Sequence, residues 1–124
     1  MKTKRKKKGS KHSLYVSTKS GKTEKADSSY EARRMRALDE SPLVKRWTKD
    51  HRIRIGYKDG RRRRRYIPDF LIEMTDGRVI IEEVKGHVWD RMKFHRKNVA
   101  AELYCSFRGL TFRIIYGDKL EEVS

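Results

Sequence analysis

The stretch of residues 78–85 constrains the possible folds of this chain more than any other part of the sequence. It has the length of a β-strand and contains the unbroken apolar run Val79-Ile80-Ile81, followed by Val84. Because successive side chains of a strand point to opposite faces, this strand is apolar on both faces. Such strands are usually covered on both faces, so we expect an α/β protein with helices flanking a sheet.

A helix is expected upstream of this strand, over residues 29–39. Ser28 or Ser29 can cap it, and Glu31 lies in its first turn, where the helix dipole stabilises a carboxylate. The apolar residues at helical spacing, which we expect to face the core, are Ala32, Met35 and Leu38.

The residue pattern also predicts further strands and a second helix. The expected strands span residues 51–57, 61–74, 78–85 and 110–116, with turns at Lys58-Asp59-Gly60 and Asp76-Gly77. A helix is expected over residues 88–107, with the inward-facing apolar stripe Met92, Val99, Leu103 and Phe107. Because this helix connects the last two strands, we expect parallel pairing for the final strand. The predicted order is helix, three strands, helix, strand, in a mixed sheet.

Charge and cysteine content limit the functions that this chain of 124 residues can have. It carries 33 Lys and Arg against 17 Asp and Glu, a formal net charge of +16, which predicts a polyanionic partner. DNA is the leading candidate, with RNA or an anionic membrane as alternatives. Cys105 is the only cysteine, which excludes an internal disulfide and a cysteine-based zinc cluster. We expect an intracellular protein in the cytoplasm of a host cell, with association with a virion left open.

Residues 1–28 are expected to form a disordered basic arm. The run Lys4-Arg5-Lys6-Lys7-Lys8 repels itself, and Gly, Ser, Thr and Lys dominate the rest of the arm. This arm is either a solvated tail or a phosphate-binding segment, and we favour the second interpretation. The expected domain then covers residues 29–117, and residues 118–124 form a C-terminal tail.

Charged residues occur within the two apolar strands before and after the turn at Asp76-Gly77. Asp69 lies between Ile67 and Phe70, and Glu83 and Lys85 continue one face of the last apolar run. Charges in a buried strand are costly unless they are paired or bound to a metal. This cost makes the three charged residues candidates for a functional site.

The register of the two strands decides whether Asp69 and Glu83 can meet. A strict two-residue turn at Asp76-Gly77 would place the two carboxylates on opposite faces of the sheet. A three-residue loop, with its glycine in the left-handed region, would instead pair Met74 with Arg78 and place Asp69 directly opposite Glu83. We predict this three-residue loop, or another register shifted by an odd number of residues.

Two carboxylates on adjacent strands, with a lysine nearby, can organise hydrolysis of a phosphodiester around a hard cation. Mg²⁺ prefers oxygen ligands, keeps several waters and uses few protein carboxylates. The cation would offset charge on the scissile phosphate, and a second metal about 4 Å away would stabilise the leaving oxygen. Lys85 would orient or help to deprotonate the attacking water, or neutralise the developing charge.

At these residues the chain resembles the PD-(D/E)xK nuclease superfamily, with Pro68-Asp69 as the PD and Glu83-Val84-Lys85 as the ExK. It also resembles TnsA-type transposon endonucleases and phage head-completion nucleases, through Ser28-Ser29-Tyr30-Glu31, Val44-Lys45-Arg46-Trp47 and the arginine-rich approach to Pro68. Residues 66–116 are similar to phage Holliday-junction resolvases of the same superfamily. The resemblance covers about residues 28–117 and implies a restriction-endonuclease-like core.

The resemblance also implies an activity and roles for individual residues. The activity is Mg²⁺-dependent DNA cleavage that leaves 5′-phosphate and 3′-hydroxyl ends, and Mn²⁺ is expected to substitute for Mg²⁺. Asp69 and Glu83 would be metal ligands, joined by the backbone carbonyl of Val84. Lys85 would be the catalytic lysine, and Glu31 would support a metal or its water.

Basic side chains near this site are expected to contact DNA. The block Arg61-Arg62-Arg63-Arg64-Arg65 falls in a predicted strand, where it would guard an exposed edge, contact phosphates, or do both. Lys93 and Arg96 are further candidates for DNA contact, although a solvated helical face is the safer interpretation for each. Glu82 is a poorer ligand candidate than Glu83, because it points to the other face of its strand.

The sequence therefore predicts an endonuclease encoded by a phage or mobile element, acting in head completion, transposon-end cleavage or junction resolution. The competing interpretation is a non-catalytic basic nucleic-acid-binding or packaging protein. That interpretation explains the charge but gives no reason for Asp69, Glu83 and Lys85 to converge. A homodimer and phage or transposition proteins remain open as partners.

Overall fold

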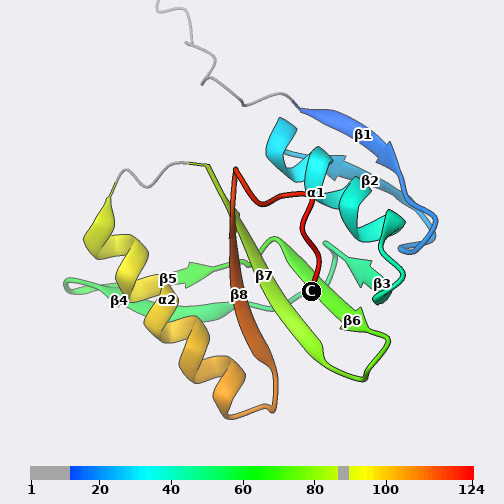
Figure 1. Cartoon of the computed structure of the whole chain (residues 1–124). Helices are drawn as coiled ribbons and strands as arrows, with labels where there is room; N and C mark the ends of the chain where they lie inside the picture. Colours follow the sequence, from blue (N-terminus) through cyan, green and yellow to red (C-terminus); the bar gives the residue numbers. More distant parts are fainter. Residues whose placement is uncertain (1–11, 87–89) are drawn as a thin grey trace, which may run out of the picture.

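The computed structural model describes residues 12–86 and 90–124, and a four-stranded mixed sheet lies at its centre (Figure 1). The strand order is β3-β6-β7-β8, with β3 at Val44–Thr48, β6 at Phe70–Met74, β7 at Val79–Lys85 and β8 at Thr111–Tyr116. The β3–β6 and β6–β7 pairs are antiparallel, whereas β7 and β8 are parallel. The helix α2 (Arg91–Ser106) makes the crossover between β7 and β8. The predicted α/β class, with a restriction-endonuclease-like core, is confirmed.

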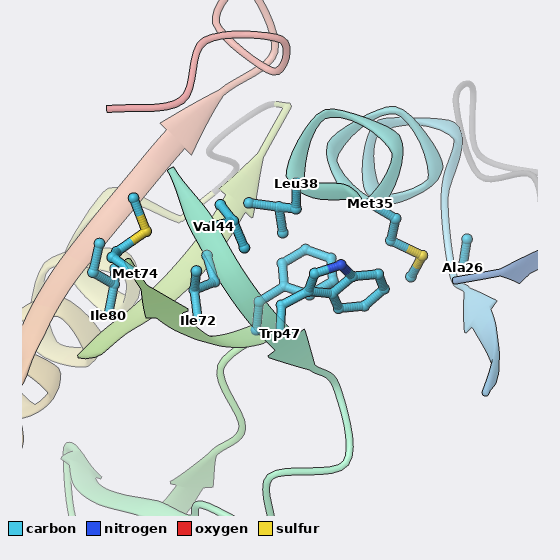
Figure 2. Packing of buried hydrophobic residues seen from close by; sticks show 9 residues of the cluster. Ala26, Met35, Leu38, Val44, Trp47, Ile72, Met74 and Ile80 are labelled. Carbon is cyan, nitrogen blue, oxygen red and sulfur yellow. The ribbon is translucent and has the colours of Figure 1, made fainter. Parts of the chain in front are cut away.

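The main core lies between this sheet and the helix α1 (Ser29–Glu40). Ser28 caps α1 as predicted, since its side chain accepts a hydrogen bond from the backbone N–H of Glu31 at 3.1 Å. The labelled side chains in Figure 2 that come from α1 are Met35 and Leu38, and both are fully buried. The rings of Trp47 and Phe70 meet edge to face, with centroids 5.5 Å apart. The predicted inner face of α1 is therefore correct.

Strand β3 was absent from the sequence-based prediction. Its two buried side chains, Val44 and Trp47, are three residues apart rather than two. A bulge between Val44 and Arg46 shifts the pairing with β6 and produces this spacing. Because the apolar residues do not alternate, the strand pattern could not be seen in the sequence.

The predicted single strand over residues 61–74 is wrong, because the structure contains two strands there, β5 (Arg62–Tyr66) and β6. Strand β5 pairs with β4 (Ile55–Asp59) in a separate antiparallel hairpin. The segment Ile67-Pro68-Asp69 separates β5 from β6. It is not part of a strand because proline cannot donate a hydrogen bond to a strand partner. Strand β4 also begins later than the predicted residue 51, after Arg52, whose φ of 58° is incompatible with an extended strand.

The predicted inward stripe of the second helix is also wrong. Met92, Val99, Leu103 and Phe107 are 60%, 44%, 55% and 85% exposed. The side chains of α2 that are buried are Ala101 and Cys105, and Ala101 packs with Ile55 and Tyr66. Small residues on this side let the helix approach the β4–β5 hairpin closely. The N-cap is Asp90, while residues 87–89 of the predicted helix lie outside the described residues.

The described part of the N-terminal arm is folded, which corrects the expectation of disorder for residues 12–28. Strands β1 (Ser13–Val16) and β2 (Thr23–Ala26) form an antiparallel hairpin. Asp39 of α1 fixes this hairpin by accepting hydrogen bonds of 2.8 Å from Tyr15 and Ser17. Lys4-Arg5-Lys6-Lys7-Lys8 lies outside the described residues.

The C-terminal segment after residue 117 is likewise part of the fold rather than a free tail. Leu120 is fully buried, and the side chain of Arg34 donates hydrogen bonds to the carbonyls of Leu120 and Glu122. Within the described residues, no helix is long and apolar enough to cross a membrane.

Candidate active site

The loop between β6 and β7 sets the register that was predicted from the sequence. Gly77 has a φ of 92°, and the backbone N–H of Met74 donates to the carbonyl of Arg78 at 2.9 Å. Further along the hairpin, Phe70 pairs with Glu82. The next position on each strand brings Asp69 opposite Glu83, on the same face. The three-residue loop is therefore confirmed.

Asp69 and Glu83 face each other across β6 and β7, close enough for the carboxyl group of Glu83 to act on the pKa of Asp69. Burial, followed by the hydrogen bond and charge of Glu83, raises the pKa of Asp69 well above its usual range. The backbone N–H of Val84 opposes this shift by donating to Oδ2 of Asp69 at 2.7 Å. Two carboxylates this close repel each other when both are ionised.

Two facing carboxylates are oxygen donors of the kind that a hard divalent cation binds. A cation between the carboxylates would offset their repulsion. The N–H of Val84 points towards Asp69, and a strand residue directs its N–H and C=O to the same neighbour, so the carbonyl faces this side too. Across residues 12–86 and 90–124, no cluster of three or more His, Cys, Asp or Glu side chains has the arrangement of a metal site. Two carboxylates with water and carbonyl oxygens suit Mg²⁺, whereas Zn²⁺ sites use more protein side chains.

Glu31 is placed next to this pair by the first turn of α1. It is 8% exposed, and its pKa is raised first by burial and then by the charge of Asp69. Its carboxylate is bound by the amine of Lys49, with Oε1 and Nζ 2.6 Å apart. The structure thus places Glu31 near Asp69, and pairs it with a lysine.

Lys49 is a site residue that sequence reasoning missed. It follows directly after β3, and its amine also contacts Oδ2 of Asp27 at 3.1 Å and the carbonyl of Lys25 at 2.7 Å. Burial lowers the pKa of Lys49, but the carboxylates of Glu31 and Asp27 outweigh this effect and raise it. No local signal marks this residue, because its role depends on the packing of β3 against α1.

Two glycines allow the first turn of α1 to reach the ends of the strands. A Cβ at Gly86 would lie 2.7 Å from Cε2 of Tyr30, and a Cβ at Gly117 would lie 3.2 Å from Cε1 of the same ring. Gly86 follows β7 and Gly117 follows β8. The ring of Tyr30 therefore packs directly on both strand ends, and Glu31 is carried with it to the site.

Lys85 and Glu83 lie on the face of β7 that α2 covers. The amine of Lys85 is 5.6 Å from the ring centroid of Phe94, a residue of α2. A second missed residue, Lys97, reaches the same place from α2, and its amine lies 4.4 Å from the ring centroid of Tyr66. Burial lowers the pKa of Lys97, against the opposing charge of Glu83.

Glu82 points to the opposite face, as predicted. Its carboxylate is fully buried and accepts hydrogen bonds from Arg34 at 2.6 and 2.8 Å and from Arg113 at 2.9 Å. Neighbouring glutamates of β7 therefore have different environments. Glu82 belongs to a buried ion cluster, and Glu83 belongs to the candidate site.

The described basic residues that were predicted to contact DNA fall into three groups. Arg64 and Arg96 both pair with Asp59, at 3.1 and 2.8 Å. Arg63, Arg65 and Lys93 line a cavity of about 570 Å³ that opens beside Glu83. Arg61 and Arg62 are exposed at the turn of the β4–β5 hairpin.

A comparison with known families agrees with this geometry. The family model described as TnsA-like endonuclease N terminal matches residues 41–117, which is more than half of the chain. The chain belongs to the TnsA-like endonuclease N-terminal family. This membership indicates a nuclease. The part shared with the TnsA-like family contains Asp69, Glu83, Lys85 and Lys97, whereas Glu31 precedes it. No curated protein gives a significant match.

Proposed function

We propose that this protein is a Mg²⁺-dependent DNA endonuclease of the PD-(D/E)xK superfamily. The observation that carries the proposal is that Asp69 and Glu83 face each other, with Lys85 two residues further along β7, in a chain of the TnsA-like family. This motif on two paired strands gives a reason for burying charges that would otherwise destabilise the sheet.

Each site residue has a role in this proposal. The carboxylates of Asp69 and Glu83 and the carbonyl of Val84 would hold the cation. When bound, Mg²⁺ offsets charge on the scissile phosphate and makes water a better nucleophile. Lys85 would orient the attacking water, whose oxygen bonds to phosphorus as the bond to the 3′ oxygen breaks. The water gives up a proton to solvent and the 3′ oxygen gains one, leaving 5′-phosphate and 3′-hydroxyl ends.

The distribution of ion pairs supports DNA as the substrate. On the α1 side of the sheet, several cations are paired: Arg33 with Glu121, Arg34 and Arg113 with Glu82, and Lys49 with Glu31. On the α2 side, several cations of β5 and α2 face the cavity beside Glu83 without such partners among the described residues. Unpaired cations next to the candidate site attract a polyanion.

The biological setting proposed is a phage or a mobile element, with transposon-end cleavage, head completion or junction resolution as the process. Mn²⁺ is proposed to substitute for Mg²⁺, and Lys4-Arg5-Lys6-Lys7-Lys8 is proposed to add phosphate contacts. The second candidate function is a non-catalytic nucleic-acid-binding or packaging protein, which the net charge of +16 favours.

A plasmid assay separates the two candidates. Supercoiled DNA incubated with the full chain is expected to be nicked or linearised in Mg²⁺ and to remain intact in EDTA, and the new ends should carry 5′-phosphates. DNA binding without cleavage in Mg²⁺, Mn²⁺ or any other divalent cation would support the non-catalytic protein and refute the nuclease.

Lys49→Met is expected to lower the nicking rate about tenfold, because Glu31 loses the amine that holds it beside Asp69. Lys49→Arg should keep most of the activity, since arginine can still pair with Glu31. The rate is measured against Mg²⁺ concentration at saturating DNA, because a change in the Mg²⁺ requirement would not follow from reduced stability alone. A Lys49→Met protein with the wild-type rate and Mg²⁺ requirement would exclude a positioning role.

A further inference from the structure

The cavity beside Glu83 is formed by two elements that are far apart in the sequence. Strand β5 contributes Arg63, Arg64 and Arg65, and α2 contributes Lys93 and Lys97. Its volume of about 570 Å³ lies in the range of cavities that hold small organic ligands. Glu83 is the one acidic residue in its wall, at the end next to the candidate metal site.

Most cations of this cavity have no carboxylate partner. Arg64 pairs with Asp59, but Arg63, Arg65, Lys93 and Lys97 make no salt bridge with any carboxylate of residues 12–86 or 90–124. Four unpaired cations in one concave surface repel each other, and they would be stabilised by a bound anion.

Lys97 is the cation whose position is most firmly set. Its amine is held over the ring of Tyr66 at 4.4 Å, and it lies within the electrostatic influence of Glu83, Lys85 and Lys93. Lys93 is one helical turn away, so both amines reach the cavity from the same side of α2.

Tyr66 supplies an independent observation, a buried hydroxyl that faces this cavity. The residue is 4% exposed and lines the cavity, and its hydroxyl lies close to Glu83. Even so, this hydroxyl has no hydrogen-bond partner of normal geometry within the described parts of the chain. A buried hydroxyl without a partner is uncommon in proteins, and an anionic oxygen in the cavity would accept its hydrogen bond.

We propose that this cavity binds the DNA phosphate adjacent to the one that is cleaved, together with its nucleoside, and that Lys97 is its central cation. The inference rests on the proposed nuclease function. The scissile phosphate belongs between Lys85 and the two carboxylates, and Glu83 lies where the cavity meets this site, so we place the group held by Lys97, Lys93 and Arg65 next to the scissile phosphate on the same strand. The site therefore orients the strand for cleavage as well as attracting it.

The first test measures binding without cleavage. The full chain is titrated into a fluorescein-labelled single-stranded octanucleotide in EDTA, at several salt concentrations. Lys97→Met is expected to weaken binding about tenfold and to lower the slope of log Kd against log salt by about one phosphate contact. Lys97→Arg should bind as the wild type does. The matched control is Lys45→Met, which removes one exposed lysine from β3 outside the cavity.

The second test needs no variant and covers the case in which Lys97→Met fails to fold. Thymidine 3′,5′-bisphosphate is added to the wild-type chain in EDTA, and its site is mapped by NMR chemical shifts. Shifts at Tyr66, Arg65 and Lys97 would support the subsite. Equal affinity and salt dependence for Lys97→Met and Lys45→Met, or ligand shifts confined to other surfaces, would overturn it.

These tests also separate the subsite from the proposed activity. A protein that binds the bisphosphate here but cleaves no DNA in any divalent cation refutes the nuclease and leaves the cavity as a phosphate-binding site without a role in cleavage. If the protein cleaves DNA but Lys97→Met binds DNA with the same affinity and salt dependence as Lys45→Met, the subsite alone is refuted.

Discussion

Asp69→Asn is expected to abolish DNA cleavage while leaving DNA binding intact. The substitution removes one of two carboxylates that would hold the cation, and its amide cannot replace the lost charge. We expect the nicking rate in Mg²⁺ to fall by about 10³-fold or more. Affinity for DNA in EDTA should change little, because the cations that line the cavity remain in place.

The same variant should lose its response to metal. Mg²⁺ is expected to raise the melting temperature of the wild type, since a ligand that binds only the folded state stabilises it, and to leave that of Asp69→Asn unchanged. Asp76→Asn is the matched control, because it makes the same chemical change at the far end of the β6–β7 hairpin. Wild-type nicking by Asp69→Asn would remove the central residue of the proposed site.

Substitutions at the neighbouring residues Glu82 and Glu83 are expected to have opposite effects on stability. Glu82→Gln leaves Arg34, which is fully buried, without a compensating charge. Breaking such a pair costs about 3–5 kcal/mol, a large part of the stability of a small domain. The melting temperature should therefore fall by more than about 10 °C.

Glu83→Gln should leave the melting temperature in EDTA unchanged or raise it, because one of the two facing carboxylates becomes neutral. The charge of Glu83 is a cause of the raised pKa of Asp69, so its removal reduces the cost of ionising Asp69. Cleavage should nevertheless be lost, since the cation loses a ligand. Thermal unfolding of both variants in EDTA checks this prediction, and equal destabilisation by the two substitutions would contradict the assignment of their faces.

The candidate carboxylate pair could be predicted from the sequence because its causes are local. An unbroken apolar run identified β7 as a strand covered on both faces, and a glycine suited to positive φ set the loop before it. Once the loop length is known, the two-residue period of a strand fixes that Asp69 and Glu83 face each other. The start of α1 at Ser28 and the place of Glu31 in its first turn were also predicted locally, through the capping rules of a single helix turn, whereas the role of Glu31 at the site was implied only by the family resemblance.

The tertiary structure alone decided which other residues join the site. Lys49 reaches Glu31 because a bulged strand packs beside α1, and Lys97 reaches Glu83 because Ala101 and Cys105, rather than the large apolar residues of α2, face the interior. Neither choice is visible locally, because the rotation of a helix and the pairing of a strand depend on the surfaces they meet. The sequence by itself determined the two facing carboxylates and their lysine, whereas long-range packing, whose free energy is shared among many distant side chains, decided the cations that surround them.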